Sequence, residues 1–221
     1  MNSQAPSRPP LSTADGIKMV RLLGTVSFVC GLLIVITHRG TLSAIGRNQE
    51  RLTREAVAEL LPGMQRQVVY SVHGGELSKG EGSDRLAGKI YAGYDASGKL
   101  LGLVMEASER GYADMIKAMY AYSPSKRCIT GFKVLEMKET PGLGDKIATD
   151  KNFLENFKQL VYDPDHPIVA VKAGAKKNNW EIDAISGATI SSRAVGRMLN
   201  RSIREMAPLI ERNLRRIEKG E

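Results

Sequence analysis

The sequence predicts an α+β protein: a single N-terminal transmembrane helix, followed by a domain built on a mixed or antiparallel sheet. Two observations support this class. An apolar run covers residues 19–37, near the amino terminus. Beyond it, short strand-like segments separated by turn residues recur along the chain, and segments with helical periodicity lie towards its end. Short strands joined by tight turns favour antiparallel pairing over a doubly wound parallel sheet.

The apolar run 19–37 is long enough to cross a bilayer, since a helix of this length measures roughly 28 Å. Its only charge is Arg21, and residues 22–36 have no polar face. A buried core helix and a cleaved signal peptide are the alternatives. Leu42-Ser43-Ala44 is a poor cleavage site, so an uncleaved anchor is favoured. Basic residues flank both ends, so charge does not decide the orientation.

The expected organisation has four parts. Residues 1–17 are a Pro/Ser-rich disordered tail, 18–38 the anchor, 39–63 a stalk helix that ends at Pro62-Gly63, and 64–221 the folded domain. Strands are expected at 67–72, 89–94, 99–106, 115–122, 129–137 and 167–171, with a Gly-rich loop at 74–82 and a hairpin turn at 95–98. Helices are expected at 150–160 and 189–207, and Pro208 kinks the second or starts a further helix to 219.

Composition excludes several classes of site. The chain has 221 residues, of which 42% are hydrophobic, and a formal net charge of +8. Two Cys and no CxxC exclude a disulfide scaffold and a zinc or iron–sulfur site of that type. Three dispersed His without HExxH predict that there is no metal centre. The positive net charge is compatible with binding to nucleic acid, to anionic lipid or to phosphate-bearing ligands.

A run of small residues, Ser186-Gly187-Ala188-Thr189, stands directly before the helix predicted at 189–207. Small side chains let a bulky group approach the backbone, and a helix N-terminus offers free N–H groups and a positive dipole end. This arrangement suits a phosphate, and Ser191 and Ser192 add hydroxyl groups. The simpler interpretation is an N-cap that serves stability alone.

A second segment, Glu139-Thr140-Pro141-Gly142-Leu143-Gly144, follows a predicted strand. Pro141, Gly142 and Gly144 favour a tight loop that lays its backbone and Leu143 against a planar ring, or else a plain connector. The Gly pair is too short for a dinucleotide-binding motif, and there is no P-loop and no GxSxG.

Together these segments resemble a known family. Asp183-x-x-Ser186-Gly187-Ala188-Thr189 resembles the flavinylation motif of the FMN-binding domain family, and ETPGLG resembles that family's second signature. With the anchor, the chain is similar to the G subunit of the Rnf electron-transport complex. The C subunit of sodium-pumping NADH:quinone oxidoreductases is the next nearest relative. Met137-Lys138 departs from the family, which often has a His shortly before the glutamate.

The resemblance implies FMN joined to the Thr189 oxygen by a phosphoester. A separate flavin transferase would form the bond, with Asp183 in its recognition motif. The other implied cofactor-binding residues are Ser186, Gly187, Ala188, Glu139, Thr140, Gly142, Leu143 and Gly144. No catalytic residue and no metal ligand is expected, because the chain relays electrons as one part of an ion-translocating ferredoxin:NAD oxidoreductase complex. The implied partners are the membrane-embedded Rnf subunits, and the FMN domain is expected to face the extracytoplasmic side of the cytoplasmic membrane.

Several alternatives remain at this point. The chain resembles the quinone-reductase C subunit less closely, and it also fits a free-standing anchored flavoprotein or a structural subunit without flavin. A membrane-tethered basic binding module is a different class, suggested by eight Lys and Arg in residues 191–219. These alternate with an apolar stripe and lack aromatic neighbours, so we expect a solvated helix face and no nucleic-acid partner. Trp180 is expected to be a core aromatic, or else to stack on a ring.

Overall fold

The computed structural model describes residues 13–80 and 88–221. These residues fall into two compact units, and the boundary lies between Arg51 and Leu52, inside the first helix. Helix α1 spans Thr13–Leu60 and is the one described helix long and apolar enough to cross a membrane. It includes residues 13–17 of the predicted tail, the predicted anchor, and the predicted stalk as far as Leu60. Residues 1–12 lie outside the described part.

The second unit contains a seven-stranded sheet in which every neighbouring pair is antiparallel, in the order β2-β1-β3-β4-β5-β6-β7. Its strands are β1 (Arg66–His73), β2 (Glu76–Lys79), β3 (Gly88–Tyr94), β4 (Leu100–Arg110), β5 (Met115–Ser123), β6 (Cys128–Glu136) and β7 (Leu160–Val161). A two-stranded parallel sheet pairs β8 (Val169–Val171) with β9 (Glu181–Asp183). The α+β class is thereby confirmed.

Three helical segments complete this unit: η1 (Gly144–Ala148), α2 (Lys151–Glu155) and α3 (Thr189–Lys219). The helix expected at 150–160 is thus cut short, because chain 160–161 pairs with β6 as β7. The loop expected at 74–82 is wrong for 76–79, which form β2. Gly74 and Gly75 both have positive φ, which suits a two-residue hairpin turn; residues 81–82 lie outside the described part.

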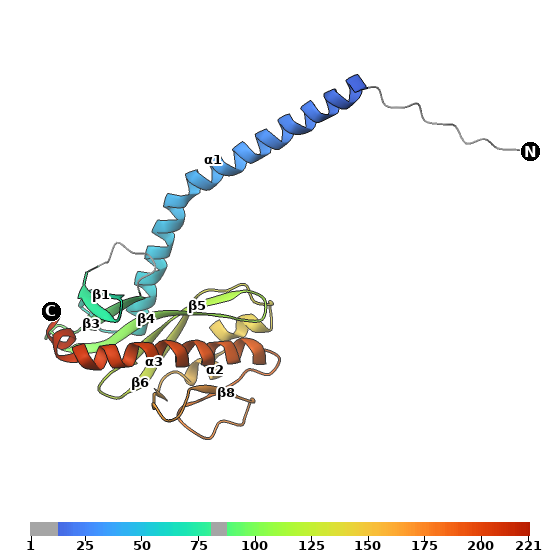
Figure 1. Cartoon of the computed structure of the whole chain (residues 1–221). Helices are drawn as coiled ribbons and strands as arrows, with labels where there is room; N and C mark the ends of the chain where they lie inside the picture. Colours follow the sequence, from blue (N-terminus) through green and yellow to red (C-terminus); the bar gives the residue numbers. More distant parts are fainter. Residues whose placement is uncertain (1–12, 81–87) are drawn as a thin grey trace, which may run out of the picture. The chain divides into compact units, whose positions relative to one another are not determined.

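Alternation along the strands gives the sheet two apolar faces. Leu103 and Met105 of β4 belong to the larger core cluster, whereas Val104 between them belongs to the smaller one. Helix α3 lies across the first face, where Figure 1 shows it running along the sheet, and it contributes the stripe Ala194, Val195, Met198, Leu199, Ile203, Ala207, Ile210 and Ile217. Pro208 lies inside this helix, which continues to Lys219 as one element because its apolar stripe stays buried on both sides of the proline.

The opposite face of the sheet receives the end of α1. Ala56, Val57 and Leu61 pack there against Tyr91, Val104, Met119 and Ala121. Glycines leave room for the two leucines: a Cβ on Gly131 would lie 2.8 Å from Leu60 Cδ2, and one on Gly102 2.9 Å from Leu61 Cδ2. Because these two glycines have no side chains, the sheet surface is flat there, and Leu60 and Leu61 pack directly against it.

A larger side chain at one of these glycines should destabilise the second unit. In Gly102→Val, the new Cβ would also meet the carbonyl oxygen of Tyr122 at 3.3 Å, which the backbone cannot easily move. We expect the free energy of unfolding to fall by ~1–3 kcal/mol in urea titrations of the detergent-solubilised chain. Leu101→Val, at the exposed neighbouring position, should change it by less than ~0.5 kcal/mol. A Gly102→Val chain as stable as the wild type would contradict this packing.

Candidate flavin site

The motif residues 186–189 form a turn that leads into α3. Ala188 N–H donates to the Ile185 carbonyl at 3.0 Å, and Gly187 has φ +85°, a conformation that favours glycine. Ala188 is the N-cap and Thr189 the first helical residue. Ser192 ties the turn to the helix, since its hydroxyl accepts from Ile185 N–H at 3.1 Å and donates to the Ala188 carbonyl at 2.9 Å.

The Thr189 side chain is exposed, and its hydroxyl has no hydrogen-bond partner among the described residues. No side chain caps the first turn of α3 in the described part of the chain, and that turn contains no acidic residue. The N-cap interpretation of the motif is therefore wrong: the N-cap is an alanine, and the threonine beside it serves no capping role. What remains is a free hydroxyl at the positive end of a 31-residue helix.

The ETPGLG segment is a second turn. Leu143 N–H donates to the Thr140 carbonyl at 3.2 Å, and Gly142 has φ +77°, so Pro141 and Gly142 occupy the central positions that a type II turn requires. Thr140, Gly142 and Leu143 are exposed, whereas Gly144 is buried. A Cβ on Gly187 would lie 3.3 Å from Leu143 Cδ2, which shows that the two motifs touch each other.

Glu139 is the residue that joins the motifs, and it is only 8% exposed. Its Oε2 accepts from Ser191 Oγ at 2.6 Å and from Tyr112 N–H at 3.4 Å, while its Oε1 accepts from Ala113 N–H at 3.2 Å. The carboxylate thus links three segments: the ETPGLG turn, the first turn of α3 and the β4–β5 turn. The carboxylate is buried, and its hydrogen bonds hold these three segments together.

Two glycines make room for this carboxylate. A Cβ on Gly111 would lie 2.2 Å from Glu139 Oε1, and one on Gly144 would lie 2.7 Å from Oε2. Both distances are shorter than any real contact, so neither position accepts a larger residue without displacing Glu139. The final glycine of ETPGLG is therefore explained by sterics, because its φ is not positive in this structure.

Asp183 is the last residue of β9, and its polar atoms form hydrogen bonds within the protein. Its Oδ1 accepts from Gly174 N–H at 2.7 Å, and its own N–H donates to Asn156 Oδ1 at 3.0 Å. Asn156 is buried and donates from Nδ2 to the carbonyls of Phe153 and Asp183. These bonds fix the strand that enters the motif turn, so Asp183 orients the loop whatever else it does.

Several charged residues lie close to the two motifs in the sequence or in the fold. In the β4–β5 turn, the Met115 N–H and, to a smaller extent, Lys138 hold the pKa of Asp114 below its ordinary value. Arg193 follows Thr189 by one helical turn and is exposed. Asp145, just after ETPGLG, has a buried Oδ1 without a hydrogen-bond partner in the described chain, so the loop retains a free acceptor. The described residues contain no group of three or more His, Cys, Asp or Glu side chains that could hold a metal ion.

The residues fit a phosphate-linked flavin. The exposed hydroxyl, the small residues before it and the uncapped helix end suit a phosphodiester. The exposed Leu143 offers an apolar contact for a ring. Trp180, the other aromatic considered for the ring, is half-buried and stacks on His166 with 4.4 Å between ring centroids. It is absent from both core clusters, so the expectation of a core aromatic is wrong.

Comparison with known proteins agrees with this site. The sequence profile of the FMN-binding domain family matches residues 111–204. The G subunit of an ion-translocating oxidoreductase complex from Methanosarcina acetivorans is 34% identical, over 80% of this chain and 87% of the relative. The chain belongs to this G-subunit family. The G subunit of the sodium-translocating ferredoxin:NAD oxidoreductase complex of Acetobacterium woodii is 27% identical, over 84% of this chain and 89% of that one.

Solved structures show the same fold. NqrC of Shewanella oneidensis superimposes with a TM-score of 0.58 at 20% identity, covering 78% of this chain and 98% of that one. The C subunit of the sodium-translocating NADH-quinone reductase of Parabacteroides distasonis gives 0.59 at 19% identity, covering 76% and 96%. The family profile begins at Gly111, so it includes the β4–β5 turn that sequence reasoning missed. The signal there was a glycine before an aromatic residue between two strands, which by itself indicates only a turn.

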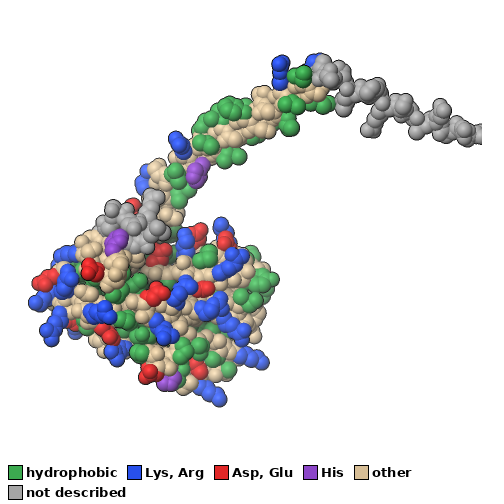
Figure 2. Space-filling view, viewed as in Figure 1, with side chains coloured by type: hydrophobic (Ala, Val, Ile, Leu, Met, Phe, Trp, Pro, Cys, Tyr) green, Lys and Arg blue, Asp and Glu red, His purple; other side chains and the backbone are tan. Residues whose placement is uncertain are grey.

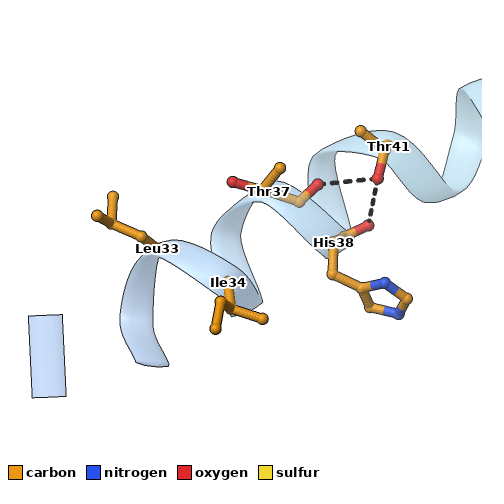
Figure 3. A pocket seen from close by; sticks show the side chains of 5 residues that line it. All are labelled: Leu33, Ile34, Thr37, His38 and Thr41. Atoms are coloured by element: carbon orange, nitrogen blue, oxygen red, sulfur yellow. Dashed lines mark hydrogen bonds between the residues drawn. The ribbon is translucent and has the colours of Figure 1, made fainter. Parts of the chain in front are cut away.

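Outside this unit, a concave surface lies along α1, lined by Leu33, Ile34, Thr37, His38 and Thr41. Figure 3 shows that all five come from one helix and that the Thr41 hydroxyl donates back to the Thr37 and His38 carbonyls. Those bonds satisfy the Thr41 hydroxyl within the helix.

Removing the Glu139 carboxylate should loosen the site. Glu139→Ala leaves the Tyr112 and Ala113 N–H groups and the Ser191 hydroxyl without their acceptor, and we expect a loss of ~2–3 kcal/mol in the free energy of unfolding. The matched control is Glu136→Ala, which removes an exposed ion pair with Lys117 and should cost no more than ~1 kcal/mol. Equal stability of the two variants, measured by urea titration, would show that Glu139 does not brace the site.

Proposed function

We propose that this chain is a membrane-anchored flavoprotein subunit that relays electrons within an ion-translocating ferredoxin:NAD oxidoreductase complex, with FMN joined to Thr189 by a phosphoester. The observation that carries the proposal is the exposed, unpartnered Thr189 hydroxyl at the first residue of α3, inside the Asp-x-x-Ser-Gly-Ala-Thr motif of the described chain. The FMN-binding profile and the G-subunit relatives support the flavin and the complex.

Attachment is a substitution at phosphorus. The Thr189 oxygen bonds to the phosphorus of a flavin donor whose phosphate is part of a phosphoanhydride. The P–O bond to the outgoing phosphate breaks, and the hydroxyl proton passes to a base of the transferase. No base lies within hydrogen-bond reach of this hydroxyl among the described residues, so a separate flavin transferase supplies the catalysis. Exposure of Ser186, Gly187 and Thr189 gives such an enzyme access to the site.

Once the ester forms, one negative charge stays on the phosphodiester at the helix end. The dipole of α3 favours an anion there by ~0.3–1 kcal/mol, and Arg193 adds a positive charge one turn along. FMN, when bound, supplies one-electron and two-electron redox chemistry. The protein's own part is to position the group and to control the water and charge around it.

The alternatives differ in what supports them. The quinone-reductase C subunits share the fold at 19–20% identity, whereas the G-subunit relatives are more similar in sequence, which favours the ferredoxin:NAD complex.

A basic binding module gains little support. Figure 2 shows acidic side chains interspersed among the Lys and Arg on the visible face, and both Arg197 and Arg201 pair with Glu109.

Thr189→Val keeps the shape of the side chain and removes the oxygen that would bond to phosphorus. When the chain is produced together with a flavin transferase, we expect the wild type to show a fluorescent flavin band on a denaturing gel and Thr189→Val to show none. Thr149→Val makes the same chemical change at another exposed threonine and should keep the band. A band that persists in Thr189→Val would refute the assignment.

We also propose that the FMN domain lies on the extracytoplasmic side, as the family resemblance implies, and one introduced thiol tests this. Ala96 lies exposed in the β3–β4 hairpin turn, whereas Cys128 is buried. We expect Ala96→Cys to react with a membrane-impermeant maleimide in right-side-out vesicles, and the parent chain to react far less. Labelling that appears only after the vesicles are opened would place the domain on the cytoplasmic side.

A further inference from the structure

Three large apolar side chains stand out on the surface of the second unit. Tyr112, Ile190 and Leu143 are 65%, 51% and 47% exposed, which makes them the most exposed large hydrophobic residues among its described positions. They come from the β4–β5 turn, the first turn of α3 and the ETPGLG turn. A cluster of exposed apolar residues drawn from three segments indicates a surface that something covers.

All three side chains belong to the neighbourhood of Thr189. Ile190 is the next residue along α3, and Leu143 lies against Gly187. Tyr112 is brought there by Glu139, since one carboxylate oxygen accepts from both the Tyr112 N–H and the Ser191 hydroxyl. Because Ser191 lies in the first turn of α3, these two hydrogen bonds hold the Tyr112 backbone close to the helix end that carries Thr189.

We infer that Tyr112 packs its ring against the isoalloxazine of the FMN carried on Thr189, with Leu143 and Ile190 as apolar neighbours. This inference rests on the proposed function. An ester at the phosphate holds only one end of FMN, and the ribityl chain leaves the ring free to swing. A planar ring of this size gains most from an aromatic partner, and Tyr112 is the exposed aromatic that the fold delivers to the site.

The competing aromatic is already engaged. Trp180 stacks on His166, and His166 in turn bonds through Nδ1 to Asp163 at 2.9 Å. Tyr112, in contrast, has no aromatic partner among the described residues. The β4–β5 turn is also well fixed, since Gly111 N–H donates to the Asp114 carbonyl at 2.9 Å and Glu139 holds both following amides. Tyr112 therefore acts as a positioning residue on a rigid support.

Flavin emission reports this contact independently of electron transfer through the complex. A phenol ring in contact with photoexcited flavin passes an electron to it and takes it back, which shortens the emission lifetime without net chemistry. We expect the flavin-loaded wild-type chain in detergent to emit weakly. Tyr112→Leu should be several-fold brighter, with a longer lifetime and lower anisotropy, because the ring is then both unquenched and mobile.

Two further variants separate quenching from packing. Tyr112→Phe keeps an aromatic face but is a far poorer electron donor, so it should brighten the flavin while preserving the wild-type anisotropy. Met115→Leu changes another exposed apolar residue, the first of β5 directly after the β4–β5 turn, and should leave lifetime and anisotropy unchanged. Intact mass, measured on every sample, confirms that flavin is attached in equal amount.

The outcomes are distinguishable. If wild-type chain made with the transferase lacks the flavin mass, the proposed function fails and this inference fails with it. If Tyr112→Leu carries the full flavin mass and its lifetime and anisotropy equal those of the wild type, attachment stands and only the role of Tyr112 is overturned.

Discussion

The buried carboxylate of Glu139 is the interaction on which the site depends. Its two oxygens receive hydrogen bonds from Ser191, Tyr112 and Ala113, which lie on segments widely separated in the sequence. A buried carboxylate is stable only where donors replace the water it has lost, so the three segments must keep their positions to satisfy it. The absent side chains of Gly111 and Gly144 complete the arrangement by making space for it. The geometry around Thr189 therefore depends on a buried group in a neighbouring segment.

The same logic separates two kinds of residue within the motifs. Thr189, Ser186 and Leu143 are exposed and open to a ligand or an enzyme, whereas Glu139, Gly144 and Asp183 are occupied inside the protein. A motif of this type encodes both a reactive position and the framework that holds it. That Glu139 and Asp183 also contact the flavin stays a prediction beside these structural roles.

Much of this was predictable from local sequence. Short strand-like segments bounded by turn residues predicted the strands now seen as β1, β3, β4, β5 and β6, and the Asp-Ala-Ser-Gly run predicted the hairpin turn between β3 and β4. The helical periodicity beyond residue 189 predicted the helix that begins at Thr189. Sequence could not show β2, whose glycine-rich setting is typical of a loop, nor β7, which exists only because β6 supplies its partner. Tyr112 was missed for the same reason: its place at the site comes from one long-range hydrogen bond, and no local pattern encodes that.

Helix α3 is also secured at its far end, where Lys79 Nζ donates to the Gly220 carbonyl at 2.6 Å and the Tyr94 hydroxyl donates to that of Ile217. With Glu139 holding its first turn, the helix cannot slide or tilt over the sheet without breaking bonds at both termini. Electron tunnelling slows exponentially as the gap between donor and acceptor widens. Because both ends of α3 are fixed, the proposed attachment site at Thr189 varies little in its distance to a redox partner, and the rate of electron transfer through it should vary little as well.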